Sequence, residues 1–487
     1  MSTVKRVRKN IFALSLGSLS KVLTILLLIF CANMLKGENW GILAAALALT
    51  EIFSVVADLG LSSLTIREVA RDRNQAGRYL ANVAFLKIFL GLITFISIVI
   101  VSNLGNKTHL ELMVIYILTF RIILYSLGKF LESLFQAFEK MEYSAFVSTL
   151  ERATTFFLGY LALRLGMGLM GVAWAIFMGS AFYLLVTILI VIKKFVKPKL
   201  LIEPRFLKSL IKASLPFALT FIFIVIYFRV DMIMLREMKG AVVVGWYAAS
   251  YQILQGLMIV PGITMAVLFP LLARYYKYSN KSLIITYEKS FKYMLYLALP
   301  IAVGITLLAD KVILLLYPGL GGYENSIIAL KILVWASALI FVNTVMANVM
   351  NSINEVKRTS LFMGINVIIN VFLNLIFIPE WGLNLSYKGA AITTLICEGV
   401  GFYLFYSFLS KKLVSLGLTR LIAKPLFASS LMAIFIFLAP ENFNLFMMVA
   451  ISVFLYLSVL YLTRSFDDLD AKIWREALSR VWVGARG

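Results

Sequence analysis

Residues 170–192 read MGVAWAIFMGSAFYLLVTILIVI, and residues 193–214 after them read KKFVKPKLLIEPRFLKSLIKAS. The first stretch has no acidic or basic side chain and is long enough to cross the hydrocarbon core of a bilayer as a helix. The second stretch is basic and contains Pro198 and Pro204, so it interrupts the apolar run. The pair predicts a membrane span that ends at a charged membrane surface, and the same alternation recurs along the whole chain.

The composition supports this interpretation. Of 487 residues 61% are hydrophobic, and the mean hydropathy is +0.93, whereas a soluble domain is roughly 45–50% apolar. Since lipid satisfies no backbone hydrogen bonds, and the alternating strands of a barrel are absent, we predict an all-α polytopic membrane protein. The fourteen predicted transmembrane helices lie at about 11–34, 41–63, 80–102, 111–135, 145–164, 170–192, 215–235, 244–271, 291–309, 326–349, 359–379, 388–410, 424–440 and 445–463.

Basic residues are divided unequally between the two membrane sides. Of the 46 Lys and Arg residues, 32 fall in alternate connections that begin with the amino terminus, and the opposite connections hold seven. This positive-inside pattern predicts that both termini are cytoplasmic. The net charge of +22 is therefore assigned to the membrane surface, where anionic headgroups attract it, and not to nucleic-acid binding.

The long basic break divides six predicted spans from the next six. The predicted units are an N-terminal six-helix bundle (1–192), a cytoplasmic amphipathic linker (193–214), a C-terminal six-helix bundle (215–410), helices 13 and 14 (411–463) and an amphipathic cytoplasmic tail (464–487). Residues 41–46 and 245–250 begin the second and eighth spans with similar small residues, which indicates an internal repeat and sets Glu51 opposite Gln255.

Four basic residues lie deep in predicted spans, namely Lys21, Arg121, Arg152 and Arg229. Each costs roughly 2.5–3.5 kcal/mol on insertion scales, so they must face protein or water. Because guanidinium forks match phosphate oxygens, we predict that these four bind an anionic phosphate or pyrophosphate headgroup in a hydrated cavity. Structural pairing of Arg121 with Glu151, and of Arg229 with Asp231, is the alternative.

Buried carboxylates supply candidates for ion coupling. Glu51, Asp231 and Glu398 lie within spans, where desolvation allows a carboxylate to bind and release a proton or hold a sodium ion. Lys87 and Lys129 lie nearer span ends, and we expect their side chains to reach the interface.

Neutral polar residues form a third set. The candidates for a glycan path are Tyr251, Gln252, Gln255, Asn366, Asn370 and Asn374. The three asparagines are spaced four apart on one helix face. They either hydrogen-bond helices to one another or line a path for sugar hydroxyls, and the sequence leaves both open.

Other chemistries find no support. The two cysteines, Cys31 and Cys397, sit within predicted spans, so we expect no disulfide. The sequence has no nucleotide-binding glycine loop, no metal-spaced Cys/His cluster and no nucleophile elbow. We therefore expect no metal, no bound cofactor and no enzyme activity, with coupling to a proton or sodium gradient or to the membrane potential as the possible energy source.

Several motifs together resemble one family. They are Tyr227 to Leu235 (YFRVDMIML), Val244 to Tyr251 (VGWYAASY), Leu268-Phe269-Pro270, Asp58-Leu59-Gly60-Leu61 with Arg67, Phe135 to Lys140 (FQAFEK), and Asn370 to Asn374 (NVFLN) with Pro379 and Gly389-Ala390-Ala391. Their order and spacing are similar to those of Wzx-type polysaccharide flippases in the multidrug/oligosaccharidyl-lipid/polysaccharide (MOP) exporter superfamily. The resemblance implies a V-shaped pair of six-helix bundles around a central cavity.

The resemblance also implies ATP-independent transfer of a polyprenyl-linked oligosaccharide from the inner to the outer leaflet. We therefore expect a monomeric flippase of the cell membrane whose partners are its lipid-linked substrate, membrane lipids and other glycan-assembly proteins. The alternatives are a cation-coupled multidrug exporter of the same superfamily, a peptidoglycan-precursor flippase, and a non-transporting membrane scaffold.

Overall fold

The computed structural model describes residues 17, 19–196, 202–318, 322–440, 442–466 and 470, and the regular structure in this part is helical. The helices are α2 (Lys21–Leu35), α3 (Gly37–Asp58), α4 (Leu61–Arg71), η1 (Arg73–Gln75), α5 (Ala76–Asn103), α6 (His109–Ala137), α7 (Met141–Arg164), α8 (Gly168–Lys194), α9 (Pro204–Lys239), α10 (Ala241–Leu257), α11 (Ile259–Tyr278), α12 (Asn280–Leu316), α13 (Glu324–Ser352), α14 (Val356–Phe377), α15 (Ser386–Lys412), α16 (Leu418–Leu438) and α17 (Leu445–Leu462).

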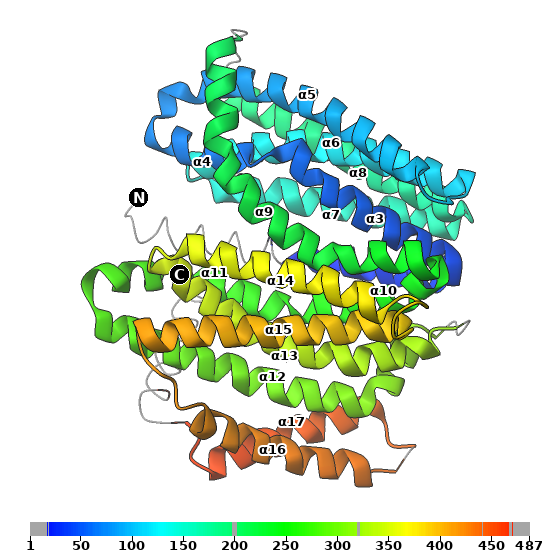
Figure 1. The fold of residues 1–487 in the computed structure, drawn as a ribbon, viewed down its shortest axis with the longest axis vertical. Coiled ribbons are helices and arrows are strands. Elements are labelled where there is room, and N and C mark those ends of the chain that lie inside the picture. The colour runs from blue at the N-terminus through cyan, green and yellow to red at the C-terminus, as the bar shows by residue number, and fades with distance from the viewer. Residues whose placement is uncertain are drawn as a thin grey trace, which may run out of the picture.

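The helices form two large groups and a small one. Figure 1 shows α3 to α8 together at the top of the view, α10 to α15 below them, and α16 with α17 at the bottom. Helix α9 runs between the two large groups, and it contacts α3 and α4 of the first and α10 and α14 of the second. This is the predicted pair of bundles with two additional C-terminal helices.

Helices of the described residues overlap all fourteen predicted spans, although the first span is described mainly from residue 19 onward and the eighth is formed by α10 and α11. By length and apolarity, eleven helices of the described residues qualify as membrane-spanning, or twelve if α9, bent by 48° between Leu219 and Phe221, counts as one span. The described part of α2 is short, and α7 carries Glu151 and Arg152 at its centre. The structure thus confirms an all-helical multi-pass membrane protein, and the number of qualifying spans is close to fourteen but below it.

Helix α9 differs from the prediction at its start. It begins at Pro204, a residue compatible with the first helical turn, so the amphipathic stretch 206–212 is helical and leads through the 48° bend into the span. The Phe206 ring packs edge-on against Tyr79 with centroids 5.2 Å apart, and the Arg78 guanidinium lies 4.0 Å from the Phe206 ring centroid. The start of α9 is therefore attached to the first bundle.

The carboxyl-terminal tail is visible only at its beginning. The amphipathic helix predicted within 464–487 lies outside the described residues, apart from 464–466 and 470. Asp470 is buried and accepts hydrogen bonds from Lys289 Nζ (2.7 Å), Lys292 Nζ (2.6 Å) and Tyr293 Oη (2.5 Å). These contacts hold Asp470 against α12.

The two halves of the internal repeat meet where α3 crosses α10. Trp40 is fully buried at this crossing, and its Nε1 donates to the carbonyl oxygen of Gly245 at 3.2 Å. A Cβ atom on Gly41 would lie 1.7 Å from the carbonyl oxygen of Ala241, so only glycine allows this approach. The small residues that indicated the repeat are therefore the contact surface between the bundles.

Candidate functional site

A cavity of about 440 Å³ lies between the two bundles. Its wall on the first bundle comes from α2, α3, α6, α7 and α8, and its opposite wall comes from α9, α10 and the start of α11. All four predicted headgroup residues, Lys21, Arg121, Arg152 and Arg229, line this one cavity. Residues separated by up to about two hundred positions in the chain thus converge, as the cost of burying each charge in lipid requires.

Arg152 and Arg121, two of the three basic residues of the first bundle, are held in different ways. Arg152 Nη1 donates to the Gly17 carbonyl oxygen (2.7 Å) and to Ser20 Oγ (2.5 Å). The Arg121 guanidinium lies 4.8 Å from the Tyr125 ring centroid, and its buried Nε has no hydrogen-bond partner among the described residues. Arg121 and Glu151 both line the cavity, but the predicted ion pair between them does not form in the described structure. Arg121 therefore retains a donor for a ligand.

Arg229 pairs with an acid of the opposite bundle. Its Nε donates to a carboxylate oxygen of Glu51 on α3. The alternative pairing with Asp231 does not form, because residues two apart on a helix point to different faces. Glu51 is thus an ion-pair partner within the cavity, and the pair joins the two bundles.

The cavity has an excess of basic groups. Lys21, Arg121, Arg152 and Arg229 line it together with two carboxylates, Glu51 and Glu151, so four basic side chains face two acidic ones. Its remaining lining is neutral and largely apolar. In such surroundings the electrostatic attraction for an anion is stronger than in bulk water.

The other two predicted coupling acids lie away from this cavity, in the core of the second bundle. Asp231 accepts hydrogen bonds from Asn374 Nδ2 (2.7 Å), Tyr247 Oη (3.0 Å) and Thr394 Oγ1 (3.1 Å). Glu398 accepts from Tyr227 Oη (2.6 Å) and Asn343 Nδ2 (2.8 Å). Both carboxyl groups are therefore buried with neutral donors and without an ion-pair partner among the described residues.

The asparagine stripe belongs to the same core. Asn366, Asn370 and Asn374 are at most 4% exposed, and Asn374 Nδ2 also donates to Asn370 Oδ1 at 3.1 Å. Of the two roles that the sequence left open, their position matches helix-to-helix bonding. Tyr251 is likewise buried, and its hydroxyl donates to the Phe228 carbonyl oxygen at 3.2 Å.

Two of the predicted glycan-path residues do line the cavity. Gln252 and Gln255 lie on α10 in the wall opposite the first bundle. Gln252 is 5% exposed, and its Oε1 has no hydrogen-bond partner among the described residues. A buried amide oxygen without a partner is an available acceptor for a ligand hydroxyl.

The expectation that Lys87 reaches the membrane interface is wrong. Its side chain is buried, and Nζ lies 2.5 Å from Asp58 Oδ1, 2.8 Å from Ser126 Oγ and 2.9 Å from the Ser126 carbonyl oxygen. Lys129 also pairs within the first bundle, with Glu132 at 2.8 Å. Asp58 also accepts a hydrogen bond from Ser62. The presence of this acidic residue near the end of a predicted span was the sequence signal that could have indicated a buried partner for Lys87.

No group of three or more His, Cys, Asp or Glu side chains capable of holding a metal occurs in the described part of the chain. Cys31 and Cys397 are both buried and free.

Comparison with known proteins agrees with this architecture. Residues 7–276 match the family described as "Polysaccharide biosynthesis protein". No curated protein sequence matches the chain. Solved structures of similar fold also match, and nearly the whole length of each of the three described next is covered.

The structure of the lipid II flippase MurJ in an inward closed conformation matches with a TM-score of 0.77 and 15% sequence identity. The match covers 92% of this chain and 98% of the MurJ chain. An inward-facing multidrug resistance MATE family transporter of the MOP superfamily has a TM-score of 0.66 and 17% identity, covering 82% and 98%. A MOP superfamily transporter from Pyrococcus furiosus, described as having a binding pocket of reverse polarity, has a TM-score of 0.57 and 16% identity, covering 83% and 96%.

The matched proteins are transporters and flippases, and the resemblance to Wzx-type flippases is confirmed. The chain belongs to the polysaccharide biosynthesis protein family and has the fold of the MOP exporter superfamily.

Proposed function

We propose that the protein is a flippase that moves a polyprenyl-phosphate- or pyrophosphate-linked oligosaccharide from the cytoplasmic to the outer leaflet by ATP-independent alternating access. The observation that carries this proposal is the convergence of four basic side chains from both bundles on one cavity. This excess of basic groups does not stabilise a neutral or cationic cargo, whereas it stabilises a phosphate headgroup. The glycan would serve cell-surface polysaccharide assembly, in keeping with the family.

The two walls of the cavity offer different contacts to the phosphate and to the sugar of such a cargo. Arg121 and Arg152 on one wall supply guanidinium donors for phosphate oxygens, and Gln252 and Gln255 on the other supply amides that match sugar hydroxyls. The polyprenyl tail stays in an apolar environment. A second cavity of about 670 Å³ between α12, α16 and α17, lined almost entirely by apolar side chains such as Ile305, Met432 and Val453, suits an isoprenoid chain.

Coupling to an ion gradient is assigned to the second bundle in this proposal. Asp231 lies beside the Asn374 side chain, whose buried Oδ1 has no hydrogen-bond partner in the described structure. A carboxylate next to an unsatisfied amide oxygen provides the oxygen ligands that a hard cation prefers, and the same carboxylate accepts a proton. Glu51 is the weaker candidate because it already neutralises Arg229.

The test uses purified protein in proteoliposomes loaded with lipid-linked oligosaccharide extracted from the host membrane. We expect inner-leaflet glycan to become accessible to an added glycosidase only in the presence of the protein, and faster when an ion gradient is imposed. Absence of protein-dependent exposure, with authentic lipid and correctly oriented protein, would refute the flippase proposal.

A peptidoglycan-precursor flippase is the second candidate, because the fold match with the highest TM-score reported above is a lipid II flippase. Its substrate class is also polyprenyl-linked, so competition between the two lipids in the same assay distinguishes them. An ethidium efflux assay tests the third candidate, a multidrug exporter. The proposed setting is the cell membrane, with a monomeric protein and both termini cytoplasmic.

A further inference from the structure

One face of α9 carries two arginines that both pair with the first bundle. Arg229 and Arg236 are seven residues apart, or about two helical turns, so they lie on the same side of the helix. Arg229 pairs with Glu51 of α3, and Arg236 pairs with Glu111 of α6. The adjacent Glu237 pairs with Lys107, in the connection before α6. We call these three contacts the α9 ion pairs.

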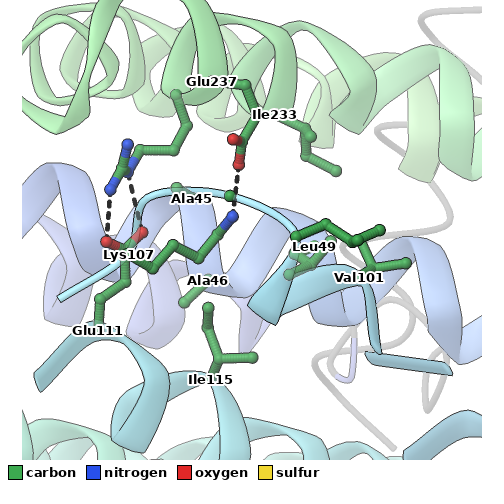
Figure 2. A pocket seen from close by; sticks show the side chains of 12 residues that line it. Ala45, Ala46, Leu49, Val101, Lys107, Glu111, Ile115, Ile233 and Glu237 are labelled. Carbon is green, nitrogen blue, oxygen red and sulfur yellow. Dashed lines mark hydrogen bonds and ion pairs between the residues drawn. The ribbon is translucent and has the colours of Figure 1, made fainter. Parts of the chain in front are cut away.

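The two pairs beyond the cavity are well formed. Arg236 donates from Nε (2.9 Å) and Nη2 (2.5 Å) to the two oxygens of Glu111, whose side chain is 2% exposed. Lys107 Nζ lies 2.6 Å from Glu237 Oε1, and the Lys107 side chain is 6% exposed. Figure 2 shows Lys107 extended toward Glu237, with the Glu111 carboxylate beside it. Bidentate geometry and burial make the Arg236–Glu111 pair stronger than a surface ion pair, whereas the Glu237 side chain of the other pair is 43% exposed.

These pairs enclose a small pocket at the same end of the molecule as other contacts between the bundles. The pocket, of about 220 Å³, is lined by Ala45, Ala46 and Leu49 of α3 together with the paired side chains. At this end Tyr323 Oη donates to the Ala32 carbonyl oxygen (2.7 Å) and Asn33 Nδ2 donates to the Leu316 carbonyl oxygen (2.8 Å). The connections here are those that the distribution of basic residues assigns to the outer side.

The second half of α9 is hydrogen-bonded to the second bundle, because Asp231 accepts from Tyr247 of α10 and Asn374 of α14, and the Tyr227 hydroxyl donates to Glu398 of α15. Its ion pairs therefore connect two bodies that alternating access must separate. The Arg229–Glu51 pair lines the cavity, whereas Arg236, Glu237, Glu111 and Lys107 are absent from the cavity lining. A ligand in the cavity reaches the first pair but not the other two.

We propose that the α9 ion pairs are the lock that holds the outer end closed, and that an anionic headgroup in the cavity weakens it by competing with Glu51 for Arg229. The second half of this statement rests on the proposed function. Once Arg229 turns to the headgroup, only two of the three α9 ion pairs remain to resist opening. Binding of the correct cargo thereby favours outward opening. Cargo binding in the cavity and opening of the outer end are then linked by a coupling free energy.

Accessibility of a cavity cysteine tests the lock without any transport assay. The reporter is Thr24→Cys, an exposed cavity-lining position, in full-length protein whose buried cysteines are replaced (Cys31→Ala, Cys397→Ala). A membrane-impermeant maleimide is added from the outer side of oriented vesicles. We expect Lys107→Gln combined with Glu111→Gln to label about tenfold faster than the parent. The exchange Glu111→Arg with Arg236→Glu should restore slow labelling, because it preserves the pair.

A control variant and the addition of inorganic pyrophosphate complete the experiment. Lys412→Gln removes an ion pair with Glu355 that joins elements of the second bundle only, so its labelling should equal that of the parent. Inorganic pyrophosphate should accelerate labelling of the parent and have no such effect on Arg229→Gln. If the outer-pair variants label like the parent, the lock is refuted. If those variants open but pyrophosphate changes nothing, competition at Arg229 is refuted, and a positive result from the glycosidase assay would still support the flippase.

Discussion

The first-bundle wall of the cavity and the polar core of the second bundle both hold groups that lipid would exclude, but they solve that problem differently. Arg121 faces a cavity and keeps a donor without a partner, whereas Asp231 is surrounded by three neutral donors inside a helix bundle. A half-buried charge that lines a cavity and keeps an unsatisfied donor is available to a cargo, whereas an enclosed charge with its hydrogen bonds satisfied is available only to something as small as an ion. The difference separates cargo binding from ion coupling.

The largest expected effect comes from removing two basic side chains of the cavity wall. We expect Arg121→Ala with Arg152→Ala to lower the flipping rate at least about 100-fold, since two charge-assisted hydrogen bonds to the headgroup are lost. Glycosidase accessibility in proteoliposomes measures the rate, and membrane insertion should remain normal. The control Lys277→Ala with Lys281→Ala removes the same charge from exposed positions outside the cavity. Equal rates in both double variants would remove the basis for cargo binding at this wall.

A smaller effect of a different kind is expected in the polar core. Asp231→Asn should lower gradient-driven flipping about tenfold, which is within the range of typical coupling energies, while flipping without a gradient persists. The comparison variant is Glu398→Gln, which neutralises the neighbouring buried acid. Gradient dependence retained in Asp231→Asn but lost in Glu398→Gln would transfer the coupling role to Glu398, and retention in both would remove it from this core.

The neutral cavity wall should contribute less. Gln252→Met, similar in shape but without an acceptor, is expected to weaken the apparent affinity for lipid-linked oligosaccharide about threefold to tenfold, the loss of one neutral hydrogen bond. Substrate titration in the flipping assay measures this change. The same substitution should not alter competition by inorganic pyrophosphate, which has no sugar. A loss of pyrophosphate competition as well would mean that Gln252 contacts the phosphate end.

The smallest effect on transport is expected at Lys87, which lies outside the cavity and away from the proposed ion-coupling site. Lys87→Met leaves the Asp58 carboxylate without its cation, and the stability should fall by about 3 kcal/mol, as for other broken buried pairs. Flipping per folded molecule should be unchanged, and the loss should appear as a lower thermal unfolding temperature. The double variant Lys87→Met with Asp58→Leu should regain much of that stability. Reduced flipping in a protein with normal stability would assign Lys87 a transport role.

The fold was largely predictable because its signals are local. Uninterrupted apolar runs place helices at all fourteen predicted positions, and the small residues at Gly41 and Gly245 marked a repeat whose two copies do contact each other. The amphipathicity of the stretch 206–212 does not specify its surroundings, because surface helices and helices packed on protein share this pattern. Its contact with Tyr79 of α5 is seen only in the tertiary structure.

The sequence by itself determined which side chains are too costly to leave in lipid, since that cost depends on residue type and depth alone. The tertiary structure decided where each of them is accommodated. It brings Lys21, Arg121, Arg152 and Arg229 into one cavity, pairs Arg229 with Glu51, and encloses Asp231 and the asparagines in a bundle core. Helix packing determines which side chain from a distant helix pairs with each buried charge. The spacing of residues along the sequence does not specify these pairs.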